Sequence, residues 1–426
     1  MSGPWRRRFA AAAGVAAAAL VLVPTAVRWL TNPADQRLVD LDVYRTAGIA
    51  LMRGEPLYDF LTEPPQLLPF TYPPFSALLS APLAWMPWPV AQVVMILLIY
   101  AALAVSVRYA FRPLLARAGD WSPLVLGVLV ALLLCPMPLR DQVRFGQVDL
   151  FLVALCVVDC ATPRARWPRG LLVGLAMAIK LVPGVFLIYF LVTRRREAAV
   201  NALFTAAGAT LFTFALLPQD SLRFWFGALL EGDRVGSNYV TANQAVRGFL
   251  LRMYWPDPVT VAVWLVVVAL LAWTGFRYAR RLSLLGASGL LSPANSWSAE
   301  QAGIAVTGLV AVIVSPVSWI HHLAWIVLVV GALAGDGRNL RRCSAAAGVW
   351  LFYVLTIPWW GTGHIQAAKP LWEQALGRIM QSSYGLGAVT LLFVLGSWLV
   401  SEMWRETPTD QRDESRTDAS TGTYAP

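Results

Sequence analysis

Apolar runs of roughly 18 or more residues recur along most of this chain, and each is long enough to cross a bilayer as an α-helix. Of the 426 residues, 58% are hydrophobic and only 14% are charged. Little of the chain is therefore suited to a soluble surface. The sequence predicts an all-α polytopic membrane protein.

Clusters of arginine between the runs orient the predicted helices. Because cytoplasmic loops carry an excess of Lys and Arg, we place Arg6-Arg7-Arg8 and the later Arg clusters in the cytoplasm. A topology of about 12 spans then puts both termini inside. The predicted spans cover residues 9–30, 89–107, 121–137, 148–161, 169–180, 183–193, 198–217, 258–278, 303–315, 322–335, 345–359 and 384–403.

Three segments do not follow this simple pattern. The first run, roughly Phe9–Leu30, follows a basic cluster and is predicted to be an uncleaved signal anchor. The apolar stretch Phe75–Pro89 is broken by prolines and is predicted to lie at the membrane interface, since a hairpin there would move the later Arg clusters outside. Residues 404–426 have too little apolar surface to fold alone and are predicted to be a disordered cytoplasmic tail.

This topology brings the polar, motif-like segments to the outer face. They are Val39–Tyr44, Phe70–Pro74, Phe145–Asp149, the Lys180 turn, Ala242–Gln244, Ser318–His322 and Gly361–His364. Function is therefore predicted on the extracytoplasmic side.

Two carboxylates, Asp40 and Asp42, are the candidates for catalysis. In an extended segment they point to the same side, whereas in a helix they diverge. A carboxylate within hydrogen-bond reach of a hydroxyl acts as a general base; the simpler interpretation makes Asp42 the N-cap of a helix over Tyr44–Arg53. The position at the membrane edge favours catalysis, and Asp40 is preferred as the base because Asp42 is the better cap. A metal would need further oxygen ligands that the sequence does not locate, and we predict none.

Lys180 lies in an apolar run just before Pro183-Gly184, which breaks the helix. A Lys at mid-membrane depth costs about 2.5–3.5 kcal/mol, so such a residue faces a cavity or reaches the interface. We predict that its ammonium group holds a phosphate, with snorkelling to the interface as the alternative. The rarity of lysine, with Lys369 the only other, favours the first interpretation.

Other polar side chains at the outer ends of helices complete the candidate site. Adjacent histidines point in different directions on a helix and make a poor metal pair, but one that faces a cavity can bind a sugar or phosphate. Amide groups and the Asp149 carboxylate suit polyol recognition and serve equally well as helix caps. The predicted substrate-binding residues are Lys180, His321, His322, Gln147, Asn243, Gln244, Tyr44 and Tyr72.

Several functional classes have no support in the sequence. It contains no Gly-rich phosphate loop, zinc motif, Ser-His-Asp spacing or nucleotide-binding βαβ unit. The net charge of +10 reflects the cytoplasmic Arg clusters and does not indicate nucleic acid as a partner. An enzyme that works outside must then use a donor carried in the membrane, which points to lipid-phosphate sugars.

Short motifs occur in a specific order along nearly the whole chain. They are Asp40–Tyr44, Gly54–Tyr58, Phe70–Pro74, Phe145–Gln147, Trp167–Gly170, Lys180–Pro183, Asn243-Gln244 and Ser315–His322. Each is weak alone. As an ordered set they resemble the actinobacterial polyprenol-phosphate-mannose-dependent α-(1→2)-mannosyltransferases, glycosyltransferase family 87 of the GT-C membrane class.

The resemblance implies a GT-C-type bundle, with one transmembrane catalytic domain over residues 1–403 and an active site formed by extracytoplasmic loops. It implies inverting transfer of mannose, without a cofactor, from polyprenyl-phosphate-mannose to the 2-hydroxyl of a mannose on a phosphatidylinositol mannoside or a lipomannan or lipoarabinomannan acceptor in the plasma membrane. In that class an acidic residue of the first outer loop is the base, which falls here on Asp40 or Asp42. Lys180, helped by His322 or an Arg, would stabilise the leaving phosphate. Because the family pattern tolerates Asn at position 149, Asp149 is not expected to be essential as an acid.

A membrane transporter or flippase of a glycolipid or polyprenyl-phosphate sugar is the alternative. Such proteins carry broken helices and ionisable groups at the bilayer midplane, often in inverted repeats. This sequence has one broken run without a matching second half, and its polar residues gather at one predicted face. The transferase is therefore preferred.

Overall fold

The structure is a computed structural model that describes residues 3–33, 36–366 and 368–406. The helices of the first half are α1 (Pro4–Thr31), α2 (Val39–Arg53), α3 (Pro74–Ala84), α4 (Trp88–Ala110), α5 (Arg112–Ala118), α6 (Ser122–Leu134), α7 (Met137–Phe145), α8 (Asp149–Ala161), α9 (Leu171–Ile179), α10 (Val185–Val192) and α11 (Arg196–Leu216). Those of the second half are α12 (Pro218–Phe226), α13 (Val246–Leu251), α14 (Asp257–Ala287), α15 (Pro293–Val314), α16 (Ile326–Ala334), α17 (Leu340–Val354), α18 (Ile357–Trp360), α19 (Leu371–Gln381), α20 (Ser383–Phe393) and α21 (Val400–Glu406).

The prediction of an all-α polytopic membrane protein is confirmed. Within the described ranges, β-type pairing is limited to two isolated bridges, Leu61 with Pro69 and Asn243 with Trp319. In the part of the chain that the structure describes, seven helices are long and apolar enough to cross a membrane, and an eighth is added if Leu340–Val354 and Ile357–His364, bent by 44°, form one span. The predicted count of about 12 spans is not confirmed.

Helix breaks explain the difference in the count. The predicted spans at 148–161, 169–180, 183–193 and 322–335 correspond to α8, α9, α10 and α16, which contain 13, 9, 8 and 9 residues. At 1.5 Å per residue, none of these helices reaches the roughly 30 Å of a bilayer core. The 3₁₀ turn η3 (Val182–Gly184) separates α9 from α10, and η6 (Ile320–Trp325) precedes α16.

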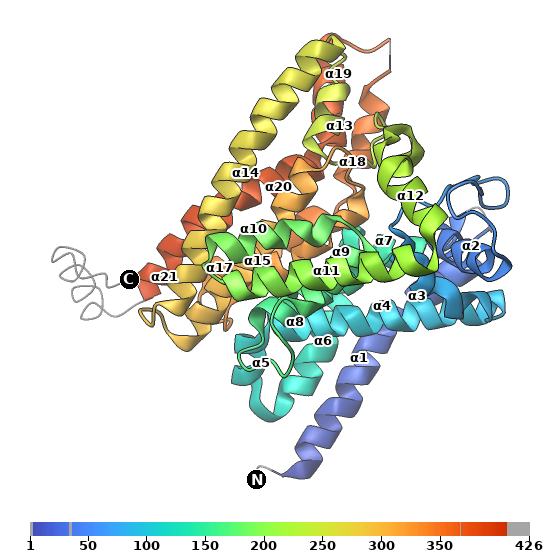
Figure 1. Cartoon of the computed structure of the whole chain (residues 1–426). Helices are drawn as coiled ribbons and strands as arrows, with labels where there is room; N and C mark the ends of the chain where they lie inside the picture. Colours follow the sequence, from blue (N-terminus) through green and yellow to red (C-terminus); the bar gives the residue numbers. More distant parts are fainter. Residues whose placement is uncertain (1–2, 34–35, 367, 407–426) are drawn as a thin grey trace.

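The centre of the bundle is α15, and 83% of its apolar window is buried. It packs against α14, α16, α10, α20 and α8. By contrast, only 11% of the apolar window of α1 and of α14 is buried. These two helices lie at the periphery (Figure 1) and present apolar side chains outward, as helices that face lipid do.

Charged contacts of the predicted cytoplasmic Arg clusters lie at one end of the bundle, which we call the Arg end. Arg195 forms an ion pair with Glu300 at 2.7 Å, and Arg342 forms one with Glu406 at 3.2 Å. The end of helix α8 lies at the Arg end too, since the carbonyl of Cys160 in its last turn accepts a hydrogen bond from Arg195. In Figure 1, α21 lies at the left of the molecule, and α2, α3 and α12 lie at the right.

A buried carboxylate at the Arg end explains one of the ordered motifs. Asp159, near the end of α8, is fully buried and accepts hydrogen bonds from the backbone N–H groups of Gly170 and Val173 and from the indole of Trp167. Those N–H groups belong to the first turn of α9 and have no partner within that helix. The Trp167–Gly170 motif therefore fixes the start of the helix that carries Lys180 at its other end.

Two further predictions concern the stretch 75–89 and the tail from residue 404. The stretch 75–89 forms the short helix α3 and the start of α4, and α3 packs on α2; its predicted position at the membrane interface stays a prediction. The predicted tail from residue 404 overlaps α21, which continues to Glu406. Residues 407–426 lie outside the described residues.

Close packing of α1 on α6 provides a test of the fold. A Cβ atom added at Gly127 would lie 2.0 Å from the carbonyl oxygen of Gly14, whereas one added at Gly208 in α11 would meet no atom within 4 Å. We expect Gly127→Ala to lower the free energy of unfolding by about 1–3 kcal/mol through overpacking. Thermal unfolding in detergent measures this. The matched control Gly208→Ala should leave the melting temperature unchanged or raise it, and equal melting temperatures for the two variants would contradict the packing.

Candidate active site

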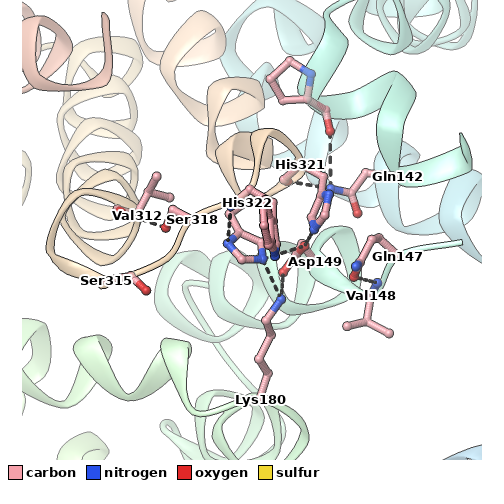
Figure 2. A network of polar contacts seen from close by, with 12 residues as sticks. Gln142, Gln147, Val148, Asp149, Lys180, Val312, Ser315, Ser318, His321 and His322 are labelled. Carbon is pink, nitrogen blue, oxygen red and sulfur yellow. Dashed lines mark hydrogen bonds and ion pairs between the residues drawn. The ribbon is translucent and has the colours of Figure 1, made fainter. Parts of the chain in front are cut away.

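Lys180 lies at the centre of a polar cluster at the end of the bundle away from the Arg end. It follows the last residue of α9 with an extended backbone (φ −150°, ψ 133°), so its side chain leaves the helix direction. Its Nζ is 2.8 Å from Oδ1 of Asp149, in the first turn of α8, and 3.1 Å from Nε2 of His322. Figure 2 shows these side chains and His321 pointing toward one another. The predicted proximity of Lys180 and His322 is thus present in the structure.

The two histidines lie on η6, and neighbouring groups fix their backbone and rings. His322 Nδ1 accepts a hydrogen bond from the backbone N–H of Trp319 at 3.2 Å. Gln142 of α7 donates its amide N–H to the carbonyl of His321 at 2.7 Å. His321 Nε2 is 3.9 Å and His322 Nε2 is 4.0 Å from Oδ2 of Asp149. Both rings therefore face the same carboxylate.

A chain of hydrogen bonds connects this cluster to the first outer loop. Tyr44 donates its hydroxyl to Gln147 Oε1 at 3.0 Å and lies 2.9 Å from the hydroxyl of Tyr72. The ring of Tyr72 lies 5.4 Å from Lys180 Nζ, within the range of a cation–π contact. Gln147 also forms a side-chain hydrogen bond with Asp40. The cluster and this chain of hydrogen bonds thus bring together six of the eight predicted substrate-binding residues and one predicted catalytic residue.

The environment of Asp40 shifts its pKa into the neutral range. Burial has the largest effect and raises the pKa to about 7, because it disfavours the charged carboxylate. The hydrogen bond from Gln147 and the positive charge of Lys180 act in the opposite direction, while the nearby Asp149 adds to the rise. A carboxyl group with this pKa exchanges protons near neutral pH, as a general base must.

Asp42 has a different environment from Asp40. Helix α2 begins at Val39 with Leu38 as its N-cap, so Asp42 is not the cap that the sequence suggested, and the two carboxylates diverge as helical residues two apart do. Burial also raises the pKa of Asp42, but the charges that act on it are Arg45 and Glu63. Of the two predicted catalytic residues, Asp40 is the one that contacts the polar cluster.

The predicted residues Asn243 and Gln244 are held by the protein backbone. Asn243 is fully buried and its Oδ1 accepts hydrogen bonds from the N–H groups of Ala245 and Ser318. Gln244 donates to the carbonyls of Thr241 and Gln381 and accepts from the N–H of Gly385. These contacts connect the loop before α13 to the segment before η6 and to α20. Both amides therefore position the loops around the site.

Asp149 and Gln142 are site residues that sequence reasoning did not select. Asp149 stood among the polar groups at outer helix ends, but nothing in the sequence places it next to Lys180, 31 residues away. Gln142 lies one helical turn before Phe145 on α7, a helix with one apolar and one polar face. The recurrence of Gln at positions 142 and 147 on either side of a Gly turn was the available signal.

Asp149, His321 and His322 have the composition of a metal site, with their nearest ligand atoms all within 4.8 Å of one another. However, Lys180 Nζ already contacts Asp149 Oδ1 and His322 Nε2. A divalent ion bound by these groups would lie next to a fixed positive charge, which is strongly repulsive at low dielectric. The cluster fits an anion better than a cation. It borders a small cavity of about 20 Å³, lined also by Leu152, Val182, Pro183, Val312, Ser318 and Trp325.

Comparison with known proteins places the chain in a family. Residues 70–316, more than half of the sequence, match the profile of glycosyltransferase family 87. This chain belongs to glycosyltransferase family 87. No solved structure matches it.

Curated relatives of this family 87 member come from mycobacteria. It is 33% identical over 384 residues to a polyprenol-phosphate-mannose-dependent α-(1-2)-phosphatidylinositol mannoside mannosyltransferase of Mycolicibacterium smegmatis, covering 84% of this chain and 83% of the relative. The same identity over 388 residues relates it to a Mycobacterium tuberculosis protein with the same description, covering 86% of each. A phosphatidylinositol pentamannoside mannosyltransferase of M. smegmatis is 34% identical over 356 residues, 80% of each chain. The relatives favour the predicted transferase over the transporter or flippase alternative.

The contacts of Gln244 predict a structural role that a variant can test. Gln244→Ala leaves the buried N–H of Gly385 and two carbonyls without their partner, so we expect it to lower the free energy of unfolding by about 1–3 kcal/mol. Gln374 is the matched control, because its side chain is only partly buried and its hydrogen bond to the carbonyl of Lys369 is exposed. Thermal unfolding in detergent measures both variants. Unchanged stability of Gln244→Ala, together with a raised KM for substrate, would instead indicate direct substrate binding.

Proposed function

We propose that this protein transfers mannose from polyprenyl-phosphate-mannose to the 2-hydroxyl of a mannose on a phosphatidylinositol mannoside, with inversion, at the outer face of the plasma membrane. The observation that supports this most strongly is the placement of the Lys180 ammonium group, bordered by two histidines, near the half-buried Asp40. The cluster suits the phosphate of the donor, and Asp40 suits the hydroxyl of the acceptor. The activities named for the relatives fit these two groups.

The chemistry requires one base and one site for the leaving phosphate. Asp40 takes the proton of the acceptor hydroxyl as its oxygen attacks the anomeric carbon of the donor mannose. The bond between that carbon and the phosphate oxygen breaks, and its electron pair leaves with the polyprenyl phosphate. Lys180 and His322 stabilise the negative charge that develops there. Because phosphate leaves as an anion, the reaction does not need the second carboxylic acid that glycosidases use.

The arginine distribution supports the orientation in the membrane. Arg195 and Arg342 belong to predicted cytoplasmic clusters and lie at the Arg end, while Asp40 and Lys180 lie at the other. The positive-inside bias assigns the Arg end to the cytoplasm. The active site then opens to the extracytoplasmic side, where a lipid-linked donor is available and nucleotide sugars are not.

The acceptor in this proposal comes from the descriptions of the relatives. Two of them act on phosphatidylinositol mannoside and a third on phosphatidylinositol pentamannoside. Lipomannan and lipoarabinomannan share the same terminal mannose chemistry and belong to the wider acceptor class. Linkage analysis of the product formed on a panel of mannosylated lipids identifies the acceptor.

Replacement of the base tests the reaction. The purified protein, supplied with radiolabelled polyprenyl-phosphate-mannose and mannosylated lipids, should transfer mannose, and Asp40→Asn should lower kcat about 10²–10⁴-fold because general-base catalysis is lost. Asp42→Asn is the matched control, since its charge neighbours are Arg45 and Glu63. Normal rates in both variants would exclude either carboxylate as the base. Direct use of a nucleotide sugar would overturn the proposed donor.

The raised pKa of Asp40 predicts a pH dependence. The carboxylate must be ionised to accept a proton, so kcat/KM for the donor should rise with pH through about 7 and fall about tenfold per unit well below it. The hydrogen bond from Gln147 lowers the pKa of Asp40, so Gln147→Leu should move the midpoint to higher pH. Initial rates at donor concentrations well below KM, from about pH 5 to about 9, measure this profile of the free enzyme. A midpoint that Gln147→Leu leaves in place would contradict the assignment of Asp40.

A further inference from the structure

Two polar groups of the cluster are buried and have no hydrogen-bond partner among the described residues. They are Oδ2 of Asp149 and Nε2 of His321, in residues that are 7% and 5% exposed. The two atoms are 3.9 Å apart, just beyond hydrogen-bond distance. Unpartnered buried groups are costly, and each in a native structure calls for an explanation. The other oxygen of Asp149 is bound to Lys180.

The contact between His322 and Lys180 brings two hydrogen-bond donors together. Its Nδ1 accepts the backbone N–H of Trp319, so a neutral ring carries its hydrogen on Nε2. That N–H is 3.1 Å from Lys180 Nζ, which is itself a donor when protonated. Two donors therefore face each other across this contact. An anionic oxygen that lies beside the two nitrogens, within hydrogen-bond distance of each, would accept from both.

A phosphate oxygen in that position would compete with Asp149 for Lys180. The carboxylate already occupies one side of the ammonium group at 2.8 Å, and it would repel a phosphate next to it. His321 offers the carboxylate another partner, because a small side-chain rotation closes the 3.9 Å gap between Oδ2 and Nε2. Asp149 thus has two alternative partners, one on each side.

We propose that Asp149 is a positioning residue that exchanges Lys180 for His321 when the donor phosphate binds, and that takes Lys180 back as the polyprenyl phosphate leaves. This inference rests on the proposed function of the site. Asp149 acts as an internal competitor of the phosphate. It holds Lys180 in place before binding and limits how tightly the anionic product is retained. His321 receives the displaced carboxylate and does not contact the substrate.

The exchange predicts that loss of the Asp149 carboxylate strengthens donor binding, whereas loss of an ordinary structural residue would weaken it. Asp149→Asn removes the competing charge while keeping the side-chain size. It should lower both the KM for polyprenyl-phosphate-mannose and the inhibition constant of polyprenyl phosphate about tenfold, the scale of one hydrogen bond to a charged group. A raised KM in Asp149→Asn would overturn the exchange.

A double-mutant cycle tests whether His321 acts on donor binding through Asp149. His321→Ala leaves the displaced carboxylate without a partner, so it should raise the donor KM about tenfold in the otherwise native protein. In the Asp149→Asn background the same change should have little effect. His364→Ala is the matched control, because that histidine pairs with Glu373 outside the cluster. If the effects of His321→Ala are equal in both backgrounds, the exchange does not occur.

Lys180→Met distinguishes failure of the exchange from failure of the proposed function. If this variant keeps the normal donor KM, the phosphate does not bind here and the proposed site is wrong. If it raises KM strongly while Asp149→Asn does not lower it, the phosphate site stands and the exchange alone fails. Thermal unfolding of each variant in detergent, with and without polyprenyl phosphate, identifies any that fails to fold. For a variant that fails, Asp149→Ser or Lys180→Gln takes its place in the same measurements.

Discussion

The ion pair between Lys180 and Asp149 is the interaction on which the site depends. The two side chains are only 13% and 10% exposed, and they join the end of α9 to the start of α8. Removing one partner of such a pair leaves a buried charge uncompensated, at a cost of about 3–5 kcal/mol. The helix break after Lys180 allows this contact, because a continuous helix through residues 180–184 would carry the ammonium group away from α8.

The surrounding framework holds the other polar groups against this pair. Gln142 fixes the backbone of His321, and Trp319 orients the ring of His322. Asn243 accepts the N–H of Ser318 and so anchors the segment that leads into η6. These structural side chains are polar because the loops that they connect have buried backbone N–H and C=O groups that need hydrogen-bond partners. Amide side chains satisfy both donors and acceptors there.

The sequence predicted the helical class, the separation of the Arg clusters from the motifs, and the meeting of Lys180 with His322. The first two features follow from local patterns of apolar length and charge bias, whereas the joint action of Lys180 and His322 was implied by the family resemblance. It did not predict the pairing of Asp149 with Lys180, since tertiary packing alone brings residues 31 apart into contact. The predicted span count depended on treating short apolar runs as complete spans, although α8, α9, α10 and α16 are each too short.

The residue types alone could not assign the amides and carboxylates to roles. Gln147 and Gln244 have the same side chain and a similar predicted position. Yet Gln147 contacts Asp40 and Tyr44, whereas Gln244 is bound by three backbone groups. The sequence preferred Asp40 because Asp42 was the better cap, but the structure separates them for another reason: α2 begins at Val39, which turns the two carboxylates to different sides.

The two ends of the proposed reaction are electrostatically coupled. The charge of Lys180 lowers the pKa of Asp40, and that of Asp149 raises it. A donor phosphate that neutralises Lys180 therefore makes Asp40 a stronger base but reduces the fraction of it that is ionised. The pKa of about 7 from which Asp40 starts lies near the neutral pH at which a general base with that pKa is most efficient. The pairing of Asp149 with Lys180 thus has a second consequence, because it sets the charge that the base experiences before the donor binds.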